Sequence, residues 1–440
     1  MFKPSLLACA LLASVGTAQA NDDLAAIRQE IAEMRAGYEA RIAALEARLK
    51  QAEPHPAATE THHAAGPDRA IAAGFNPEVS LILSGEYAQR DDRPERAITG
   101  FMPAGDSHGG ERGFNLRHTE LIVAADIDPQ FRGYATFDLA DAALEEAWFE
   151  STALGEGFSL KGGRFFSGLG SLNERHPHAW DFADTPLMYQ ALFGERFRQD
   201  GLQLKWLAPT ETYLAFGLEA GSGGNLAGAD GLVGAWSGFA KIGGDIGASH
   251  SWRAGLAYLS ARPKARAGHW EDANGDEVTT AFTGDSKAWV ADLIWKWAPQ
   301  GRAKERNLTL QAEYFQRDEQ GALACGGAGT LCAAEPSDRH GSRQSGWYAQ
   351  GVYQFMPRWR TGLRYERLDS GTLDFGANNA VLDRPDYNPD KYSLMLDYAP
   401  SEFSRIRLQF AHDRSMQGMG ENQITLQYVM SLGAHGAHKF

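Results

Sequence analysis

The segment from Ser167 to Arg198 holds the densest group of side chains that could carry chemistry. It reads SGLGSLNERHPHAWDFADTPLMYQALFGERFR and shows no two-residue alternation, whereas the chain on both sides of it does. Long loops between strands are usually functional or disordered, and the many aromatic residues here argue against disorder. The polar residues that we select as candidates are Glu174, Arg175, His176, His178, Asp181 and Asp184.

The acidic side chains of this segment could filter ions if basic side chains faced them across a pore. Facing rings of opposite charge create a field across a pore that filters ions. Basic residues on the polar phase of the predicted strands, which are candidates for the lumen wall, are Arg132, Lys161, Lys205, Arg253, Arg360, Arg364, Arg405 and Arg407. Acidic residues on that phase are Glu120, Asp138, Glu146, Glu150, Asp292, Glu313, Glu366, Asp397 and Asp413. The alternative is that these charges only satisfy one another and anchor the segment.

Histidine pairs suggest a metal site, but zinc sites need three or four converging ligands. The pairs are His176 with His178, His62 with His63, and His435 with His438. We therefore predict no metal site and no cofactor. The sequence contains no Gly-x-Ser-x-Gly or His-Glu-x-x-His motif, so we predict no enzyme. His412-Asp413 is the candidate for a hydrolytic site at the rim of a barrel.

Two cysteines follow the N-terminal region, and they are close in sequence. Cys325 and Cys332 lie seven positions apart in a glycine-rich stretch. In an exported protein this spacing predicts a local disulfide, with a two-cysteine metal site as the alternative. Asn274-Gly275, in another polar stretch, predicts a hairpin turn.

The N-terminal region divides into three parts. Residues 1–20 have a charged start, an apolar stretch and an Ala-Gln-Ala ending, as a secretory signal peptide does. Residues 21–53 are predicted to form a coiled coil, with a single amphipathic helix as the alternative, because apolar residues recur at spacings of three and four. These residues are Leu24, Ile27, Ile31, Met34, Tyr38, Ile42, Leu45 and Leu49. Residues 54–75, which contain many Pro, Ala, Thr and His, are predicted to be a flexible linker.

Composition distinguishes the remainder from an ordinary soluble protein. The chain after residue 20 has no apolar run of about 18 residues, so we expect no membrane-spanning helix. It is nevertheless rich in Gly (49), Trp (11), Tyr (14) and Phe (22). Such a composition is typical of barrels whose strands show lipid one side chain and water the next. The net charge of −14 argues against nucleic acid as a partner.

From Asn76 onward, apolar and polar residues alternate, which predicts strands. In residues 289–297, for example, three Trp, one Leu and one Ala share one face, and Asp292 and Lys296 lie on the other. Sixteen strands are expected, an even number as a closed antiparallel barrel requires. They are residues 78–90, 114–126, 131–140, 145–152, 158–166, 199–208, 212–220, 235–243, 250–260, 286–298, 305–317, 345–355, 359–369, 390–399, 403–413 and 422–432.

The expected connections alternate between short and long. The short ones fall at 126–130, 153–157, 208–211, 244–249, 299–304, 356–358 and 400–402. The long ones fall at 91–113, 167–198, 221–234, 261–285, 318–344 and 370–389. Outer-membrane barrels have short periplasmic turns and long external loops, so the alternation predicts such a barrel over residues 76–440. The terminal aromatic Phe440 is the expected barrel-assembly signal.

Several stretches resemble a Gram-negative porin family, the phosphate-selective porin group. They are FNPEVSLILSGEY, LIVAADIDPQFRGYATFDL with EEAWFES, and the closing QYVMSLGAHGAHKF. The resemblance covers residues 75–440 and implies a third external loop that folds inward, which by our count is 167–198. Similar chains are also labelled zinc-regulated TonB-dependent outer-membrane receptors. Those receptors resemble 22-stranded barrels with a globular plug, and no plug sequence is visible between Asn21 and Gly74.

The sequence therefore predicts an all-β transmembrane protein, a 16-stranded antiparallel outer-membrane β-barrel of a Gram-negative bacterium. We expect a porin for small hydrophilic solutes or ions, whose selectivity is set by the 167–198 segment facing basic lumen residues. The alternatives are an uptake receptor for zinc or another ligand, and a rim-site lipid hydrolase. Expected partners are outer-membrane lipids, lipopolysaccharide, the barrel assembly machinery and two further copies in a homotrimer. The periplasmic coiled coil is expected to brace that trimer or to contact peptidoglycan.

Overall fold

A computed structural model describes residues 77–91, 98–102, 112–151, 153–227, 233–327, 330–332 and 338–433. The predicted signal peptide, coiled coil and linker therefore lie outside the described residues. So do Phe440 and the His62-His63 and His435–His438 pairs. Among the described residues, no helix is long and apolar enough to cross a membrane.

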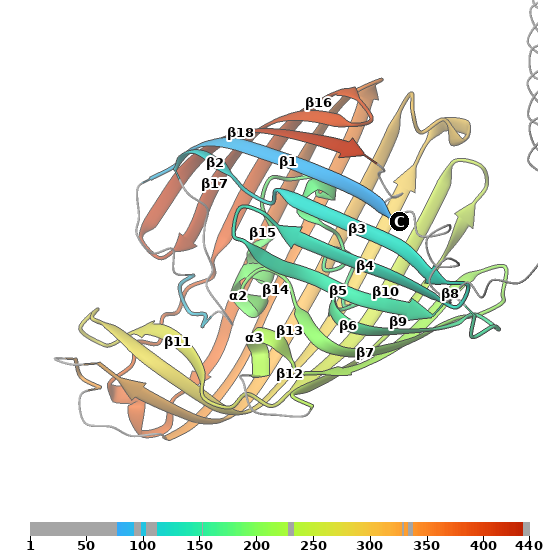
Figure 1. Ribbon diagram of the computed structural model, residues 1–440. Coiled ribbons are helices and arrows are strands. Elements are labelled where there is room, and N and C mark those ends of the chain that lie inside the picture. Colours follow the sequence, from blue (N-terminus) through green and yellow to red (C-terminus); the bar gives the residue numbers. More distant parts are fainter. Residues whose placement is uncertain are drawn as a thin grey trace, which may run out of the picture. The chain divides into compact units, whose positions relative to one another are not determined.

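Antiparallel strands make up most of the described chain (Figure 1). The strands are β1 (Glu78–Gln89), β2 (Gly113–Leu116), β3 (Glu120–Asp128), β4 (Phe131–Asp138), β5 (Ala143–Ser151), β6 (Phe158–Phe166), β7 (Arg198–Leu207), β8 (Tyr213–Gly221), β9 (Ala235–Ile246), β10 (His250–Ala261), β11 (Arg266–Glu271), β12 (Glu277–Trp297), β13 (Asn307–Gly326), β14 (Asp338–Met356), β15 (Trp359–Asp374), β16 (Asp390–Ser401), β17 (Ser404–Met416) and β18 (Met419–Gly433). The helices are η2 (Pro177–Ala179), α2 (Leu187–Phe193), α3 (Gly224–Ala227), η3 (Pro299–Gly301) and η4 (Gly376–Ala380).

The sheet closes on itself. β1 pairs with β18 on one side and with β2 and β3 on the other. Figure 1 shows the closure where β1, in blue, lies beside β18, in red. β2 and β3 occupy one place in the wall, because both pair with β1. β11 and β10 likewise pair with successive parts of β12. The eighteen labelled strands therefore form a 16-stranded antiparallel barrel, as the sequence predicts.

The two faces of the barrel differ in polarity. On β16 and β17, Leu394, Leu396 and Leu408 are exposed, whereas the neighbouring Asp397 and Arg407 are buried. The same alternation runs through β12, where Trp289 and Leu293 are exposed. An apolar outer face and a polar interior are the reverse of a water-soluble protein and are what a lipid environment requires.

Several strand boundaries differ from the prediction. The stretches 261–285 and 318–344, expected as loops, instead contain β11, the start of β12, the end of β13 and the start of β14. Buried apolar residues explain this extension: Val278, Phe282 and Leu323 pack in one cluster with Trp270 and Phe375. The strand expected at 114–126 is interrupted at 117–119, and the last two strands are joined by a turn at 417–418.

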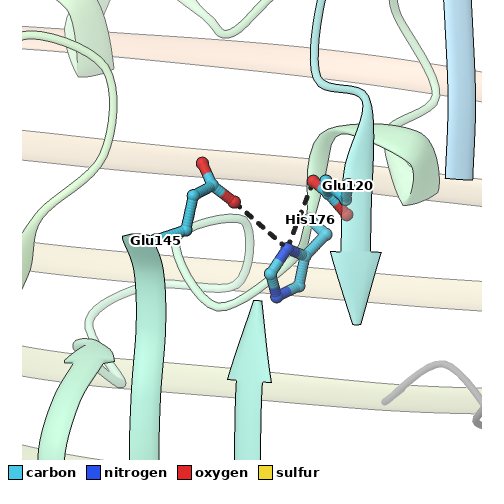
Figure 2. Close-up of side chains that lie close together, drawn as sticks. All are labelled: Glu120, Glu145 and His176. Atoms are coloured by element: carbon cyan, nitrogen blue, oxygen red, sulfur yellow. Dashed lines mark hydrogen bonds and ion pairs between the residues drawn. The ribbon is translucent and has the colours of Figure 1, made fainter. Parts of the chain in front are cut away.

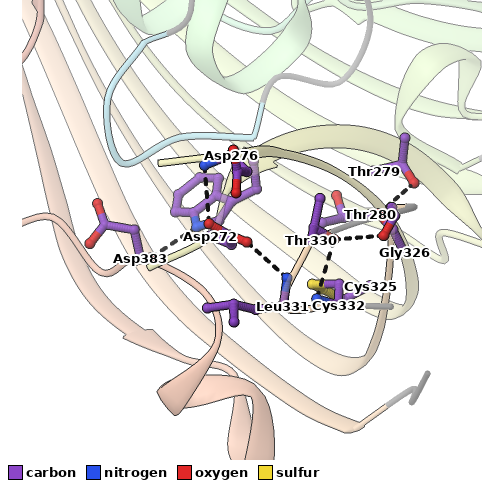
Figure 3. The surroundings of a disulfide bond; sticks show 12 residues. Asp272, Asp276, Thr279, Thr280, Cys325, Gly326, Thr330, Leu331, Cys332 and Asp383 are labelled. Carbon is purple, nitrogen blue, oxygen red and sulfur yellow. Dashed lines mark hydrogen bonds between the residues drawn. A yellow bond between two sulfur atoms is a disulfide. The ribbon is translucent and has the colours of Figure 1, made fainter. Parts of the chain in front are cut away.

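A disulfide joins Cys325 and Cys332 at the end of β13 (Figure 3). Next to it, the Leu331 amide donates a 3.0 Å hydrogen bond to Asp272, which lies in the turn between β11 and β12. That turn contains Asn274-Gly275, as the sequence predicts, and the amides of Asn274 and Asp276 donate to the same Asp272 carboxylate. Two neighbouring hairpins are thus tied together beyond the barrel wall.

Candidate functional site

The 167–198 segment connects β6 to β7, and its two ends are held together. The Ser167 amide donates a 3.1 Å hydrogen bond to the Phe197 carbonyl. The Asn173 side chain donates to both the Ser167 and Phe197 carbonyls at 2.8 Å and accepts from the Phe197 amide at 2.7 Å. Between these ends, Pro186 precedes α2 and Gly194, at φ 80°, ends it. The segment is therefore an ordered loop with its own helix, closed at its base.

The apolar side of the segment packs against buried side chains of β13, β14 and β15. Tyr189 and Phe193, on α2, lie with their ring centroids 4.8 Å and 5.5 Å from that of Phe315 on β13. Both belong to a buried cluster that also contains Tyr348 of β14 and Leu368 of β15. Because this cluster is buried, the segment is held by apolar burial as well as by polar contacts.

Glu313 on β13 is a polar anchor for the segment. Its carboxylate accepts hydrogen bonds from the Ser171 hydroxyl at 2.7 Å, the Leu172 amide at 3.1 Å and the Tyr189 hydroxyl at 2.8 Å. The Tyr348 hydroxyl donates to it as well, at 2.7 Å. Burial and the Glu313 charge raise the pKa of Tyr189 well above its ordinary value, so Tyr189 stays a donor.

Asp184 is the acidic residue of the segment with the most partners. It accepts hydrogen bonds from Arg364 at 2.9 Å, Lys391 at 2.5 Å and Gln409 at 2.8 Å, which project from β15, β16 and β17. Burial alone would raise the pKa of Asp184, but the charges of Lys391 and Arg364 hold it far below its ordinary range. Asp184 is therefore a carboxylate held by three adjacent strands.

The other two acidic candidates also meet basic side chains of the wall. Asp181 accepts a 3.0 Å hydrogen bond from Arg360 on β15. Glu174 accepts a 3.1 Å hydrogen bond from Lys241 on β9. The segment thus contacts basic residues on well-separated parts of the barrel wall.

Arg405 and Arg407, on β17, bind the backbone of the segment rather than its carboxylates. Arg405 donates to the His178 carbonyl at 2.9 Å, and Arg407 donates to the Trp180 carbonyl at 2.8 Å. Arg407 is fully buried and also forms a 2.9 Å ion pair with Asp397. These two residues fix the position of the turn around η2.

The remaining basic candidates lie away from these contacts. Arg132 pairs with the exposed Glu78 at 3.1 Å, and Lys161 lies over the Trp148 ring at 4.4 Å. Lys205 is half-buried on β7, and Arg253 acts electrostatically on Asp292 and Lys296. Lys241 and Lys391 were not among the predicted wall residues, although both fall on the interior phase of their strands.

A second group of charges surrounds His176 (Figure 2). Its Nδ1 lies 3.3 Å from Glu120 and 3.6 Å from Glu145, and its Nε2 lies 2.9 Å from Glu146. Burial alone would lower the pKa of His176, but these three carboxylates raise it well above its ordinary value. His178 joins the group through a 2.9 Å contact with Glu120. The two histidines of the His-Pro-His motif therefore meet the same carboxylate.

Two cavities adjoin the segment. One, of about 280 Å³, is lined by His178, Arg360 and Arg405 among others. The other, of about 170 Å³, is lined by Glu145, Arg196 and Arg198 among others. Both cavities therefore expose charged side chains of the segment or of the wall that holds it.

His412-Asp413, the predicted hydrolytic pair, has structural partners. His412 contacts Asn422 at 2.9 Å, and Asp413 forms a 3.5 Å ion pair with Lys391. Asp413 also accepts a hydrogen bond from the Ser415 amide at 2.8 Å. These contacts hold the ends of β16, β17 and β18 together.

A closed 16-stranded barrel with an apolar outer face and a polar interior is the fold of porin-like outer-membrane channels. Solved structures of two such proteins illustrate the similarity. The outer-membrane channel DcaP of Acinetobacter baumannii is 13% identical, with 82% of this chain and 98% of that chain covered and a TM-score of 0.51. A loop-deletion mutant of OmpT, an outer membrane protein of Vibrio cholerae, is 11% identical, with 82% and 100% covered and a TM-score of 0.50.

Sequence comparison identifies a nearer relative. A protein of Aquifex aeolicus, described as an uncharacterized protein, is 33% identical over 396 residues, which cover 83% of this chain and 80% of that protein. The chain belongs to the same family as this Aquifex aeolicus protein. No family model matches the chain.

Proposed function

We propose that the protein is an outer-membrane porin through which small hydrophilic solutes and ions diffuse passively. In this proposal the 167–198 segment is the third external loop, folded into the lumen so that it narrows the path. The observation that carries it is the contact between Asp184 and three strands of the wall, through Arg364, Lys391 and Gln409. A loop held in this way can constrict a barrel without closing it.

We infer that the lumen favours small anions. Basic side chains gather in one part of it, where Arg175 and Arg253 both act electrostatically on Lys296. Arg360 and Arg405 also line the larger cavity. Rings of basic side chains select anions in pores, and the resemblance to phosphate-selective porins supports the same sign of selectivity.

The proposed assembly is a homotrimer in the outer membrane of a Gram-negative bacterium, with residues 21–53 as a periplasmic coiled coil. Coiled coils with an apolar seam associate through that seam. Deletion of residues 22–52 is expected to lower the yield of trimer in native electrophoresis while monomer persists. An unchanged trimer yield would favour peptidoglycan contact as the role of the coiled coil.

The function is tested by planar-bilayer conductance of the purified full-length protein, with reversal potentials measured across a salt gradient. Steady ohmic current in steps of three, with a weak preference for chloride over potassium, is the expected result. Cation-selective current would overturn the charge assignment. The absence of current from folded protein would overturn the porin itself.

The role of the segment is tested by removing it. Because Ser167 and Phe197 are joined by a backbone hydrogen bond, residues 168–196 can be replaced by a short Gly-Asn turn. The shortened protein is expected to conduct several times more current per channel and to lose ion preference. If conductance and preference both stay unchanged, the segment does not constrict the path, although the channel remains.

A further inference from the structure

The carboxylates around His176 come from two strands that are not neighbours, with β4 between them. Glu120 begins β3, and Glu145 and Glu146 follow one another on β5. The register of β4 against β5 shifts between Thr136 and Phe137, so β5 contains an extra residue there. Such a bulge breaks the alternation of side chains and re-aims one of them. Both Glu145 and Glu146 are therefore buried and both reach His176.

The two ring nitrogens of His176 have different surroundings. Nε2 forms a 2.9 Å hydrogen bond with Glu146, and Nδ1 forms a longer one, of 3.3 Å, with Glu120. Nδ1 lies 3.3 Å from Glu120 Oε1 and 3.6 Å from Glu145 Oε2, and these three atoms lie within 4.8 Å of one another. Ligands bonded tetrahedrally at about 2.1 Å lie roughly 3.4 Å apart, so the two separations from Nδ1 match those of ligands that share an ion.

Each of the three groups is oriented by a second partner. Glu146 accepts from Nε2 of His176, His178 contacts the other oxygen of Glu120 at 2.9 Å, and Arg196 donates to Oε1 of Glu145 at 3.1 Å. Partners of this kind orient the ligands in metal sites, where a histidine donates its second ring N–H to a carboxylate. One oxygen of Glu120 and one oxygen of Glu145 are left facing Nδ1 of His176 (Figure 2).

A second observation points to a ligand: one oxygen of the cluster faces His176 without forming a hydrogen bond. Glu145 is only 8% exposed, yet its Oε2 has no hydrogen-bond partner among the described residues. A buried carboxylate oxygen without a hydrogen-bond partner is destabilising. Oε2 is the oxygen of Glu145 that faces His176 Nδ1, while Oε1 is taken by Arg196.

We propose that Glu120, Glu145 and His176 bind one divalent transition-metal ion through Oε1, Oε2 and Nδ1. An imidazole with two carboxylates suits Zn²⁺, Co²⁺ or Mn²⁺, whereas Mg²⁺ and Ca²⁺ prefer oxygen ligands alone. The ion takes the place of the Nδ1 proton, supplies a partner for Glu145 Oε2 and joins β3, β5 and the 167–198 segment. This site does not depend on the proposed porin function.

Zinc binding by isothermal titration to the purified full-length protein in detergent tests the site. The protein used carries His→Ala substitutions at His62, His63, His435 and His438, so that these two histidine pairs cannot contribute to the zinc signal. It is expected to bind one Zn²⁺ per chain, with Mg²⁺ failing to compete. Co²⁺ is expected to give the intense visible absorption of a four-coordinate ion.

Three further variants locate the ion. Glu145→Gln is expected to abolish the one-to-one binding, and Glu146→Gln, which removes only an orienting partner, to weaken it about 10- to 100-fold. The control His269→Asn, in the exposed pair of His269 with Glu277, is expected to leave binding unchanged. Heat-modifiable electrophoresis verifies that each barrel is folded. No binding by the starting protein, or equal binding by Glu145→Gln, overturns the proposal.

Discussion

Arg364 and Asp184 are 180 positions apart in the chain, yet Arg364 Nη2 donates a 2.9 Å hydrogen bond to Asp184 Oδ1. Arg364 is nearly fully buried, and it also donates to Glu366 at 2.7 Å and to the Asp184 carbonyl at 2.9 Å. A buried guanidinium needs such partners, since an unpaired buried charge is strongly destabilising. The pair therefore couples the position of the 167–198 segment to β15.

Asp184→Asn tests this coupling by removing the negative charge and keeping the size of the side chain. The Asp184 side chain is 22% exposed, so its ion pair should stabilise the protein more than a surface ion pair and less than a fully buried one. We expect a loss of about 2–3 kcal/mol in the free energy of unfolding, measured by urea titration in detergent. The control Glu78→Gln breaks an exposed pair with Arg132 and is expected to cost less than about 1 kcal/mol. Equal losses in the two variants would contradict the coupling.

The acid sensitivity of the protein should depend on the same carboxylate. The folded-state pKa of Asp184 is depressed, so its contribution to stability is complete above the unfolded pKa of about 3.9 and is lost as pH falls below it. We expect the urea midpoint of the wild type to drop more steeply below about pH 4 than that of Asp184→Asn. Parallel curves for the two proteins would show that other carboxylates dominate the acid response.

Two arginines that the sequence groups together should differ in their effect on ion selectivity. Arg360 lines the larger cavity and lies between Asp181 and Asp397, whereas Arg132 pairs with an exposed glutamate. Arg360→Gln removes the cation that bridges Asp181 and Asp397 and leaves Asp397 with Arg407 alone, so we expect the reversal potential to move toward cation selectivity. Arg132→Gln is the matched control and is expected to leave the reversal potential unchanged. A shift of the reversal potential of the same size in both variants would mean that Arg360 does not set the ion selectivity.

The barrel could be predicted from the sequence because alternation is a local property. Each strand carries its own apolar and polar faces, and all sixteen places in the wall were found from that pattern. The outer parts of β12, β13 and β14 were missed because their stability comes from contacts with distant residues. Val278 and Phe282, for example, are buried against Trp270 and Phe375.

The site was less accessible to sequence reasoning, for two physical reasons. A strict two-residue period places Glu146 inside the barrel but not Glu145, and the bulge in β5 overrides that period. Lys391, the second cation on Asp184, lies at the start of β16, where the alternating pattern is just beginning. A shift of register depends on pairing between strands, which no single strand sequence specifies.

The disulfide should stabilise the β11–β12 and β13–β14 hairpins rather than the barrel. Closing a loop of this length raises the free energy of the unfolded chain by about 2.5 kcal/mol at most. We expect a Cys325→Ser, Cys332→Ser double variant to retain the conductance and urea midpoint of the barrel. In this variant the two hairpins should be cleaved faster by added protease, because the contact of Leu331 with Asp272 loses its support. Loss of conductance would mean that these hairpins shape the path of ions through the channel.

Gly170 offers a direct test of how closely the segment approaches β13. Its φ is +64°, and a Cβ atom there would lie 2.3 Å from Glu313 Oε2 and 2.9 Å from the Tyr189 hydroxyl. Glu313 cannot move aside without losing its bonds to Ser171 and Tyr189. Gly170→Ala therefore combines the cost of a left-handed backbone for a residue with a Cβ atom, about 1–2 kcal/mol, with a steric clash.

Gly275→Ala supplies the matched control, because Gly275 has a similar φ of +85° and nothing within 4 Å of its Cβ position. We expect the free energy of unfolding of Gly275→Ala to fall only by the cost of the left-handed backbone. That of Gly170→Ala should fall by at least about 2 kcal/mol more, as in an overpacked core. Urea titration measures both losses, and single-channel recording should show a less constricted, noisier channel for Gly170→Ala alone. Equal losses would mean that Glu313 yields freely and does not anchor the segment.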